Sequence, residues 1–336
     1  MLSFLNRLNL IRYLVVWRVN RSIAFFPRYF SIDLSMVIGS IISNRLPTKE
    51  KSAWNKALAP LISNKTDTSR NKIKTIPDVS WPINSVLFVY PGKRAYGRDE
   101  LIFWELKLFG KHADHGLFLE VILPAMEEAS YTSDTKWNRR NRIWGHFDIQ
   151  SIYASRGNRW EPIVTDGRLD LRYRANPLQW LEDLRFKPKS SRRYRRLNWM
   201  SPFDLTMVAG KLNEFGLNYK DDSSKFTNAP TLPVILVGLI SRISELLRPR
   251  KKHTDKISDF LTSEDRGTFQ EALQTANHVS IIKNSTRSIP PVWPGKWIGT
   301  QRFSSIPRSI IPYLELASIL HIGKQTHFGC GTFVIA

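Results

Sequence analysis

The C-terminal end of the chain gathers residue types that suit chemistry on a charged ligand. Two histidines, a lysine and three glycines stand close together: His321, Gly323, Lys324, His327, Gly329 and Gly331. Histidine titrates near neutral pH and can take or give a proton, and lysine stabilises negative charge. Glycine lets the backbone approach a ligand closely, so that successive N–H groups can cradle a phosphate. The segment therefore predicts a phosphate-binding loop with His321, His327 and Lys324 as candidate catalytic groups.

The remaining histidines and the single cysteine give weaker indications of a functional site. His112 and His115 lie three residues apart beside Asp114, which is one possible arrangement for a metal pair, but no third ligand is evident. We therefore predict no metal site, and we expect no small-molecule cofactor. His146 is expected in a strand with a structural role. A single cysteine, Cys330, excludes an internal disulfide and is consistent with a reducing cytoplasm.

The overall charge points to an acidic partner. The 336 residues include 50 Lys and Arg against 29 Asp and Glu, a net charge of +21. Nucleic acid is the first candidate partner for such a surplus, and an anionic membrane surface is the second. The sequence shows no amphipathic helix with a lysine-rich face and no apolar stretch of about 20 residues. We therefore predict a cytoplasmic protein that binds nucleic acid and no membrane.

Three basic clusters, interleaved with aromatic residues, are the candidate contacts. Residues 185–196 contain no acid, and further clusters lie at 248–252 and 136–142. The candidate RNA-contacting residues there are Arg192, Arg193, Arg195, Arg196, Lys251, Arg139 and Arg140. Basic side chains neutralise phosphates, and aromatic faces stack on unpaired bases. Trp137, flanked by polar residues, is predicted to stack on a base, whereas Trp144 and Trp199 are predicted to be core.

Hydrophobic periodicity predicts an α+β fold whose first half runs strand, helix, strand, strand, helix, strand. The predicted strands are 13–26, 85–90, 100–109 and 143–154, and the helices are 32–43 and 117–129. The apolar N-terminus is interpreted as part of the first strand, and 65–74 as a loop. This element order is that of a ferredoxin-like unit.

The second half is predicted to repeat that order. Its predicted strands are 195–202, 204–208, 279–282, 296–303 and 328–335, and its helices are 233–247, 269–277 and 310–320. Ser309 is the expected N-cap of the last helix. We expect two domains, 1–155 and 189–336, joined by a linker region over 156–188.

The glycine-bearing segment resembles a known motif. The run from Pro312-Tyr313-Leu314 through His321-Ile322-Gly323-Lys324 to Phe328-Gly329-Cys330-Gly331 resembles the C-terminal glycine-rich motif of CRISPR repeat-RNA endoribonucleases of the RAMP superfamily. Three upstream segments are also similar to the family: LKLFG from Leu106, LNWMSPFDL from Leu197 and LISRISELL from Leu239. The resemblance covers most of the chain from about residue 80 and is sharpest at the C-terminus.

The resemblance implies tandem ferredoxin-like RAMP domains that bind CRISPR repeat RNA and cut it once per repeat without a metal. In that reaction the ribose 2′-hydroxyl attacks the neighbouring phosphate. The protein positions the phosphate for in-line attack, removes and donates protons, and stabilises charge. His321 matches a position that the motif often holds as histidine. It could transfer a proton, contact RNA, or serve a structural role at a helix C-terminus. His327 stands where the motif usually has a small hydroxyl residue.

The first third of the chain departs from the family pattern. The family has a glycine- and arginine-bearing helix after the first strand, often with a nearby histidine, but no histidine precedes His112 here. Two readings follow from this. The first is an endoribonuclease that converts precursor transcript to mature guide RNA. The alternative is a non-catalytic RAMP subunit that holds guide RNA in a complex with other CRISPR effector subunits.

Overall fold

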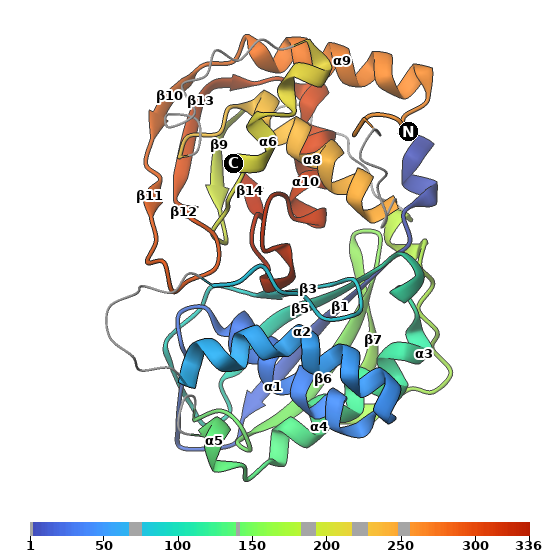
Figure 1. Cartoon of the computed structure of the whole chain (residues 1–336), viewed down its shortest axis with the longest axis vertical. Coiled ribbons are helices and arrows are strands. Elements are labelled where there is room, and N and C mark those ends of the chain that lie inside the picture. The colour runs from blue at the N-terminus through green and yellow to red at the C-terminus, as the bar shows by residue number, and fades with distance from the viewer. Residues whose placement is uncertain (1–2, 67–75, 139–141, 183–192, 217–227, 248–255) are drawn as a thin grey trace. The chain divides into compact units, whose positions relative to one another are not determined.

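The computed structural model describes residues 3–66, 76–138, 142–182, 193–216, 228–247 and 256–336 (Figure 1). The chain divides into two units. The N-terminal unit is Asn9–Leu184, and the C-terminal unit combines Met1–Leu8 with Arg185–Ala336. Both units are α+β with antiparallel sheets. Within the described residues, no helix is long and apolar enough to cross a membrane.

The N-terminal unit is built on a six-stranded sheet with the order β3-β5-β1-β6-β7-β8. The strands are β1 (Leu10–Val19), β3 (Ser85–Val89), β5 (Leu101–Phe109), β6 (Phe147–Arg156), β7 (Arg159–Thr165) and β8 (Arg168–Leu169). Alternate side chains of β1 are buried against the helices, with Trp17 stacked 3.9 Å from Phe147 and Tyr13 stacked 3.9 Å from Phe118. A separate two-stranded sheet pairs β2 (Ile23–Phe25) with β4 (Ala95–Gly97).

Helices cover one face of this sheet. They are α1 (Phe30–Arg45), α2 (Thr48–Thr66), α3 (His115–Leu117), a π-helical turn (Phe118–Ile122), α4 (Leu123–Tyr131) and α5 (Thr135–Asn138). Figure 1 shows α1, α2 and α4 grouped beside the sheet. Along the chain, α1 falls between β1 and β3, and α4 falls between β5 and β6. Short 3₁₀ turns occupy Gly110–His112 and Gln179–Leu181.

The C-terminal unit has a four-stranded sheet with the order β10-β13-β9-β14. Its strands are β9 (Tyr194–Trp199), β10 (Ile281–Asn284), β13 (Thr300–Ile306) and β14 (Phe333–Ile335), and β11 (Arg287–Ser288) pairs separately with β12 (Trp297–Ile298). Its helices are α6 (Thr206–Ala209), α8 (Leu232–Leu247), α9 (Ser263–Asn277) and α10 (Ile311–Leu320). Short 3₁₀ turns lie at Ser3–Arg7, Leu212–Phe215, Arg308–Ile310 and Thr326–Phe328. The apolar helix α8 is buried along most of its length and packs against α10.

Several predicted elements differ from the structure. The strand expected at 13–26 is β1 followed by β2, and the N-terminus is not a strand. Ser3 and Arg7 instead bond within the C-terminal unit, to Asp265 and to the Phe260 carbonyl. Helix α2 was not predicted, because a lysine-rich sequence with an internal Pro60 obscures its apolar stripe. The region 156–188, expected to be a linker, contributes β7 and β8 to the sheet.

The differences in the C-terminal unit concentrate near its turns. Residues 204–208 are not a strand, since α6 begins at Thr206. The N-cap of the 310–320 helix is Ile310, without a side-chain bond, and Ser309 lies in the preceding 3₁₀ turn. The final strand begins at Phe333, five residues later than predicted from 328, because residues with positive φ precede it.

Candidate nucleic-acid interface

The segment between α10 and β14, residues 321–332, is called the glycine loop here. Its backbone has positive φ at His321 (60°), Gly323 (94°), Gln325 (56°), Gly329 (75°) and Gly331 (82°). L-residues rarely adopt this conformation, and glycine adopts it at little cost. The glycines of the motif therefore determine the path of the chain from helix to strand.

Close backbone contacts add a second requirement for glycine. A Cβ on Gly331 would lie 1.9 Å from the carbonyl oxygen of Ile322, and one on Gly323 would lie 2.4 Å from that of Asp204. Real Cβ atoms essentially never approach another atom below 3.0 Å. Any larger residue at either position would force the two backbone segments apart.

Several N–H groups of the loop, including those of Gly329 and Gly331, are already engaged within the protein. Lys324 N donates to the Asp204 carbonyl (3.0 Å), Gly329 N to the Thr326 carbonyl (2.8 Å), and Gly331 N to the Pro202 carbonyl (2.8 Å). A phosphate cradle would require such groups to point toward a ligand. The geometry therefore favours a conformational role for these glycines over direct phosphate binding.

Neighbouring elements hold the loop in place. Asp204 precedes α6, and its carboxylate accepts hydrogen bonds from the Thr206 N–H (3.0 Å) and hydroxyl (2.6 Å). From α8, the buried Arg242 donates through Nε to the carbonyl of Leu320 (3.3 Å), the last residue of α10. A cation at a helix C-terminus satisfies a carbonyl that lacks a helical partner.

His321 and His327 are both buried within this loop. His321 is 0% exposed, and its Nδ1 lies 3.1 Å from the carbonyl oxygens of Gly329 and Cys330. Carbonyl oxygens only accept hydrogen bonds, so Nδ1 carries a proton and donates it. His327 is 4% exposed and packs edge-on against Phe328, with ring centroids 5.2 Å apart. Of the three roles open to His321, the geometry favours the structural one.

Lys324 differs from these histidines in its exposure. Its side chain is half-exposed, and in the described part of the chain its ammonium has no ion pair. It is therefore the candidate catalytic group of the loop whose charge is accessible to a ligand.

The sheet of the C-terminal unit presents a row of cations on the face opposite its core. In register, Arg196 of β9 pairs with Arg302 of β13, which pairs with Lys283 of β10. All three are exposed, whereas the neighbouring Leu197 and Phe303 are fully buried on the other face. We call Arg196, Arg302 and Lys283 the cationic row. It crosses two strand spacings, about 10 Å.

The cationic row is electrostatically unbalanced. Within the described residues, none of its three members forms an ion pair with an acid. The next positions along the sheet are uncharged: Thr300 Oγ1 donates to Asn198 Oδ1 (3.0 Å), and Val334 is 48% exposed. Like charges directly opposite one another destabilise a sheet. A polyanion lying across the face would remove this repulsion.

The residues predicted to contact RNA differ in their exposure in the structure. Arg193, Arg195 and Arg196 are exposed. The predictions for Arg192, Lys251, Arg139 and Arg140 lie outside the described residues. Trp137 is only 7% exposed, with the Lys136 Nζ 4.3 Å from its ring centroid, so the ring is packed rather than open to a base. Trp144 and Trp199 are buried, which confirms their prediction as core.

Sequence reasoning missed Arg302 and Lys283. In β13, burial alternates, with Gln301 and Phe303 buried and Arg302 exposed on the outer face. Because Gln301 is polar, this alternation is not visible in the sequence, and neither is the cross-strand register that brings Arg302 beside Arg196.

His146 is a further candidate from the N-terminal unit. It precedes β6 rather than lying in a strand, and it is half-exposed. Partial burial, and then the charge of Arg21, hold the pKa of its imidazole below the usual value. Among the described residues the imidazole has no hydrogen-bond partner. A neutral, accessible imidazole can accept a proton.

The two histidines considered for metal binding have separate partners. His112 Nδ1 accepts a hydrogen bond from the Asn84 N–H (3.1 Å), and His115 Nδ1 bonds with the Tyr13 hydroxyl (3.0 Å). In the part of the chain that the structure describes, no three His, Cys, Asp or Glu residues are grouped as metal ligands.

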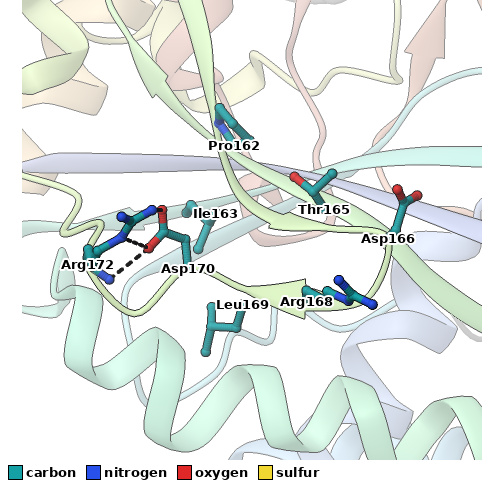
Figure 2. Close-up of a pocket in the computed structure, with 8 residues that line it drawn as sticks. All are labelled: Pro162, Ile163, Thr165, Asp166, Arg168, Leu169, Asp170 and Arg172. Carbon is teal, nitrogen blue, oxygen red and sulfur yellow. Dashed lines mark hydrogen bonds and ion pairs between the residues drawn. The ribbon is translucent and has the colours of Figure 1, made fainter.

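A cavity of about 670 Å³ lies at the β7–β8 edge of the N-terminal sheet (Figure 2). Its lining residues are Pro162, Ile163, Thr165, Asp166, Arg168, Leu169, Asp170 and Arg172. Asp170 accepts hydrogen bonds from Arg172 Nε (3.0 Å) and Nη2 (3.2 Å), as the dashed lines in Figure 2 show. The charges of the lining are mixed, and it includes no histidine, lysine or cysteine. The cavity therefore lacks a group suited to proton transfer at neutral pH.

Comparison with known proteins places the fold. No family model and no curated protein matches the chain. Among solved structures, a partial Cas6-RT-Cas1–Cas2 complex matches 98% of this chain and 46% of its own, with a TM-score of 0.50 and 10% identity. A Cas6 product complex covers 98% and 99% of the two chains (TM-score 0.47, 10% identity), and Thermus thermophilus Cas6 covers 98% and 99% (0.45, 11%).

The chain thus spans about half the length of the first of these matches. The structural match to the partial Cas6-RT-Cas1–Cas2 complex runs across nearly the whole of this chain, at low sequence identity. Likeness at this level concerns the fold, and the α+β fold of this chain is one that Cas6 structures have.

Proposed function

We propose that this protein recognises CRISPR repeat RNA and cleaves the precursor transcript without a metal, giving mature guide RNA. The observation that carries the proposal is the Cas6-like fold over 98% of the chain. The cationic row supports an RNA partner because it displays unpaired charge to solvent in a chain of net charge +21. Under this proposal the protein acts in the cytoplasm and needs no small-molecule cofactor.

We further infer that the chain consists of tandem ferredoxin-like RAMP domains. In the N-terminal unit the order is β1, α1, β3, β5, α4, β6, and in the C-terminal unit it is β9, α8, β10, β13, α10, β14. When the four strands of each unit are numbered along the chain, both sheets have the spatial order 2-3-1-4. In the N-terminal unit this is β3-β5-β1-β6, and in the C-terminal unit it is β10-β13-β9-β14. The shared order of elements and of strands supports two copies of one βαββαβ unit.

The proposed reaction needs a base, an acid and a stabiliser of charge. The 2′-hydroxyl gives up its proton and attacks the adjacent phosphorus, and the 5′-oxygen leaves with a proton. We assign charge stabilisation to Lys324, which is accessible. His321 and His327 are buried and are assigned to holding the loop rather than to the reaction.

The test is cleavage of a labelled cognate repeat RNA in the presence of EDTA. We expect an upstream product ending in a cyclic phosphate and a downstream product with a 5′-hydroxyl. A 2′-deoxy nucleotide at the cut site should abolish cleavage and leave binding intact. Cleavage of the deoxy substrate, or dependence on magnesium, would contradict this mechanism.

The alternative function is a non-catalytic RAMP subunit that retains guide RNA for other CRISPR effector subunits. The burial of His321 and His327 favours this reading, because it removes two histidines from contact with substrate. Tight binding of repeat RNA with no cleavage of any strand would support the subunit over the enzyme.

A further inference from the structure

A pair of aromatic side chains lies exposed on the sheet of the N-terminal unit. Phe103 of β5 is 42% exposed and Tyr90, just after β3, is 37% exposed. The flanking β5 residues Ile102 and Trp104 are buried on the helix-covered face, so Phe103 projects from the opposite one. Exposed rings on a sheet face cost hydration free energy, and here two occur together.

The two rings are neighbours across the strands. The Tyr90 N–H donates to the Phe103 carbonyl (3.1 Å), which continues the β3–β5 register and places the residues opposite each other. Residues opposite each other on antiparallel strands have Cβ atoms roughly 5 Å apart. We call Tyr90 and Phe103 the aromatic pair. Leu101, two residues from Phe103 on the same strand face, is also 42% exposed.

A network of buried charges orients Tyr90. Its hydroxyl donates to Glu105 Oε1, and Glu105 is held in turn by Arg12 Nη2 (3.2 Å) and by Lys107 Nζ (3.4 Å). Glu105 and Lys107 are 2% and 3% exposed. Burial, and then the nearby Glu105 charge, raise the pKa of the Tyr90 hydroxyl. The hydroxyl therefore stays protonated, and the ring is positioned before any ligand arrives.

We propose that the aromatic pair stacks an unpaired base of bound RNA, which rests on the proposed function. Two exposed aromatic side chains on one face of a sheet are an arrangement by which sheet proteins hold single-stranded RNA. The net charge of +21 favours a polyanion over an apolar protein segment as occupant. Every base has a π face, so the pair contributes affinity with little sequence preference.

The test compares Phe103→Leu with Leu101→Ala in the full chain. Leucine retains apolar bulk without a π face, and Leu101 matches Phe103 in strand, face and exposure. Binding of a fluorescein-labelled, mixed-sequence single-stranded RNA is measured by anisotropy. Phe103→Leu should raise Kd roughly 5- to 100-fold, as expected for one lost stacking contact. Leu101→Ala should change Kd less than about twofold.

An abasic scan of the RNA supplies a second readout. In the wild-type protein, one abasic position should weaken binding, and the Phe103→Leu protein should be insensitive to it. Tyr90→Leu replaces Phe103→Leu if the latter fails to fold. Equal Kd values for wild type and variant would overturn the stacking proposal and leave the function intact. A wild-type protein that binds no RNA would instead contradict the proposed function itself.

Discussion

At the residue scale, the glycine loop separates groups that hold the fold from a group that can reach a ligand. His321 is buried and donates to two carbonyls, whereas Lys324 is half-exposed without an ion pair among the described residues. The same short motif therefore combines two different physical roles. Only a comparison of stability with RNA affinity distinguishes them.

The prediction at this scale concerns Lys324→Ala and His321→Ala. Lys324→Ala should leave the melting temperature unchanged and weaken RNA binding by about 1–3 kcal/mol, through loss of a charge-assisted contact. His321→Ala should destabilise the fold by about 2–4 kcal/mol, because it opens a cavity and leaves two carbonyls without their donor. Urea denaturation and anisotropy measure the two quantities. A stable His321→Ala protein that binds RNA normally but does not cut it would make His321 catalytic.

The sign of the pH dependence follows from His146. Its pKa is lowered in the folded chain by burial and by Arg21, so the neutral form is favoured. Its contribution to stability is present above the unfolded pKa of about 6.5 and is lost as pH falls through the lower folded value. An NMR titration of the His146 imidazole should give a pKa below about 6.5, and Arg21→Ala should raise that pKa. An unchanged pKa in the variant would contradict the contribution of Arg21.

At the element scale, long apolar helices were predictable from the sequence and turns were not. Helices α1, α8 and α10 are largely apolar segments of helical length, and β3 and β5 are largely apolar strands between turn residues. The final strand was predicted too long because residues 328–332 read as strand-like in sequence. The positive φ at Gly331 is held by contacts with Ile322 and Pro202, which lie elsewhere in the chain.

The candidate site was predictable only in part for the same reason. The arginine run of 185–196 identified Arg195 and Arg196 from local sequence. Arg302 and Lys283 join Arg196 only through the pairing of distant strands. Trp137 was misjudged because polar sequence neighbours do not prevent a side chain from packing against its own unit.

The element-scale prediction compares two glycines. Gly331→Ala should lower the free energy of unfolding by at least about 1–3 kcal/mol, because its φ of 82° and the Ile322 carbonyl both exclude a Cβ. Gly267→Ala, in α9 with nothing within 4 Å of the added Cβ, should be neutral or stabilising by up to about 1 kcal/mol. Chemical denaturation checks both. Equal stability of the two variants would mean that the loop backbone is not constrained as described.

At the scale of the whole molecule, the surplus of positive charge can bind an anionic partner where the cations have no acidic side chain as an ion-pair partner. Many exposed cations of the N-terminal unit are paired, including Arg156 with Glu182, Arg172 with Asp170 and Lys93 with Glu100. The cationic row of the C-terminal unit has no such partners among the described residues. The location of unpaired charge, rather than its total, therefore identifies the candidate interface.

The most direct test of this interpretation is the salt dependence of repeat-RNA binding by two variants of equal net charge. One replaces Arg196, Arg302 and Lys283 with glutamine, and the other replaces the ion-paired Arg156, Arg172 and Lys93. Each lost single-strand phosphate contact should reduce the slope of log K against log salt by roughly 0.7, so the row variant should lose about 2. The matched control should keep a slope close to that of the wild type. Equal slopes for both variants would contradict the assignment of RNA binding to this sheet face.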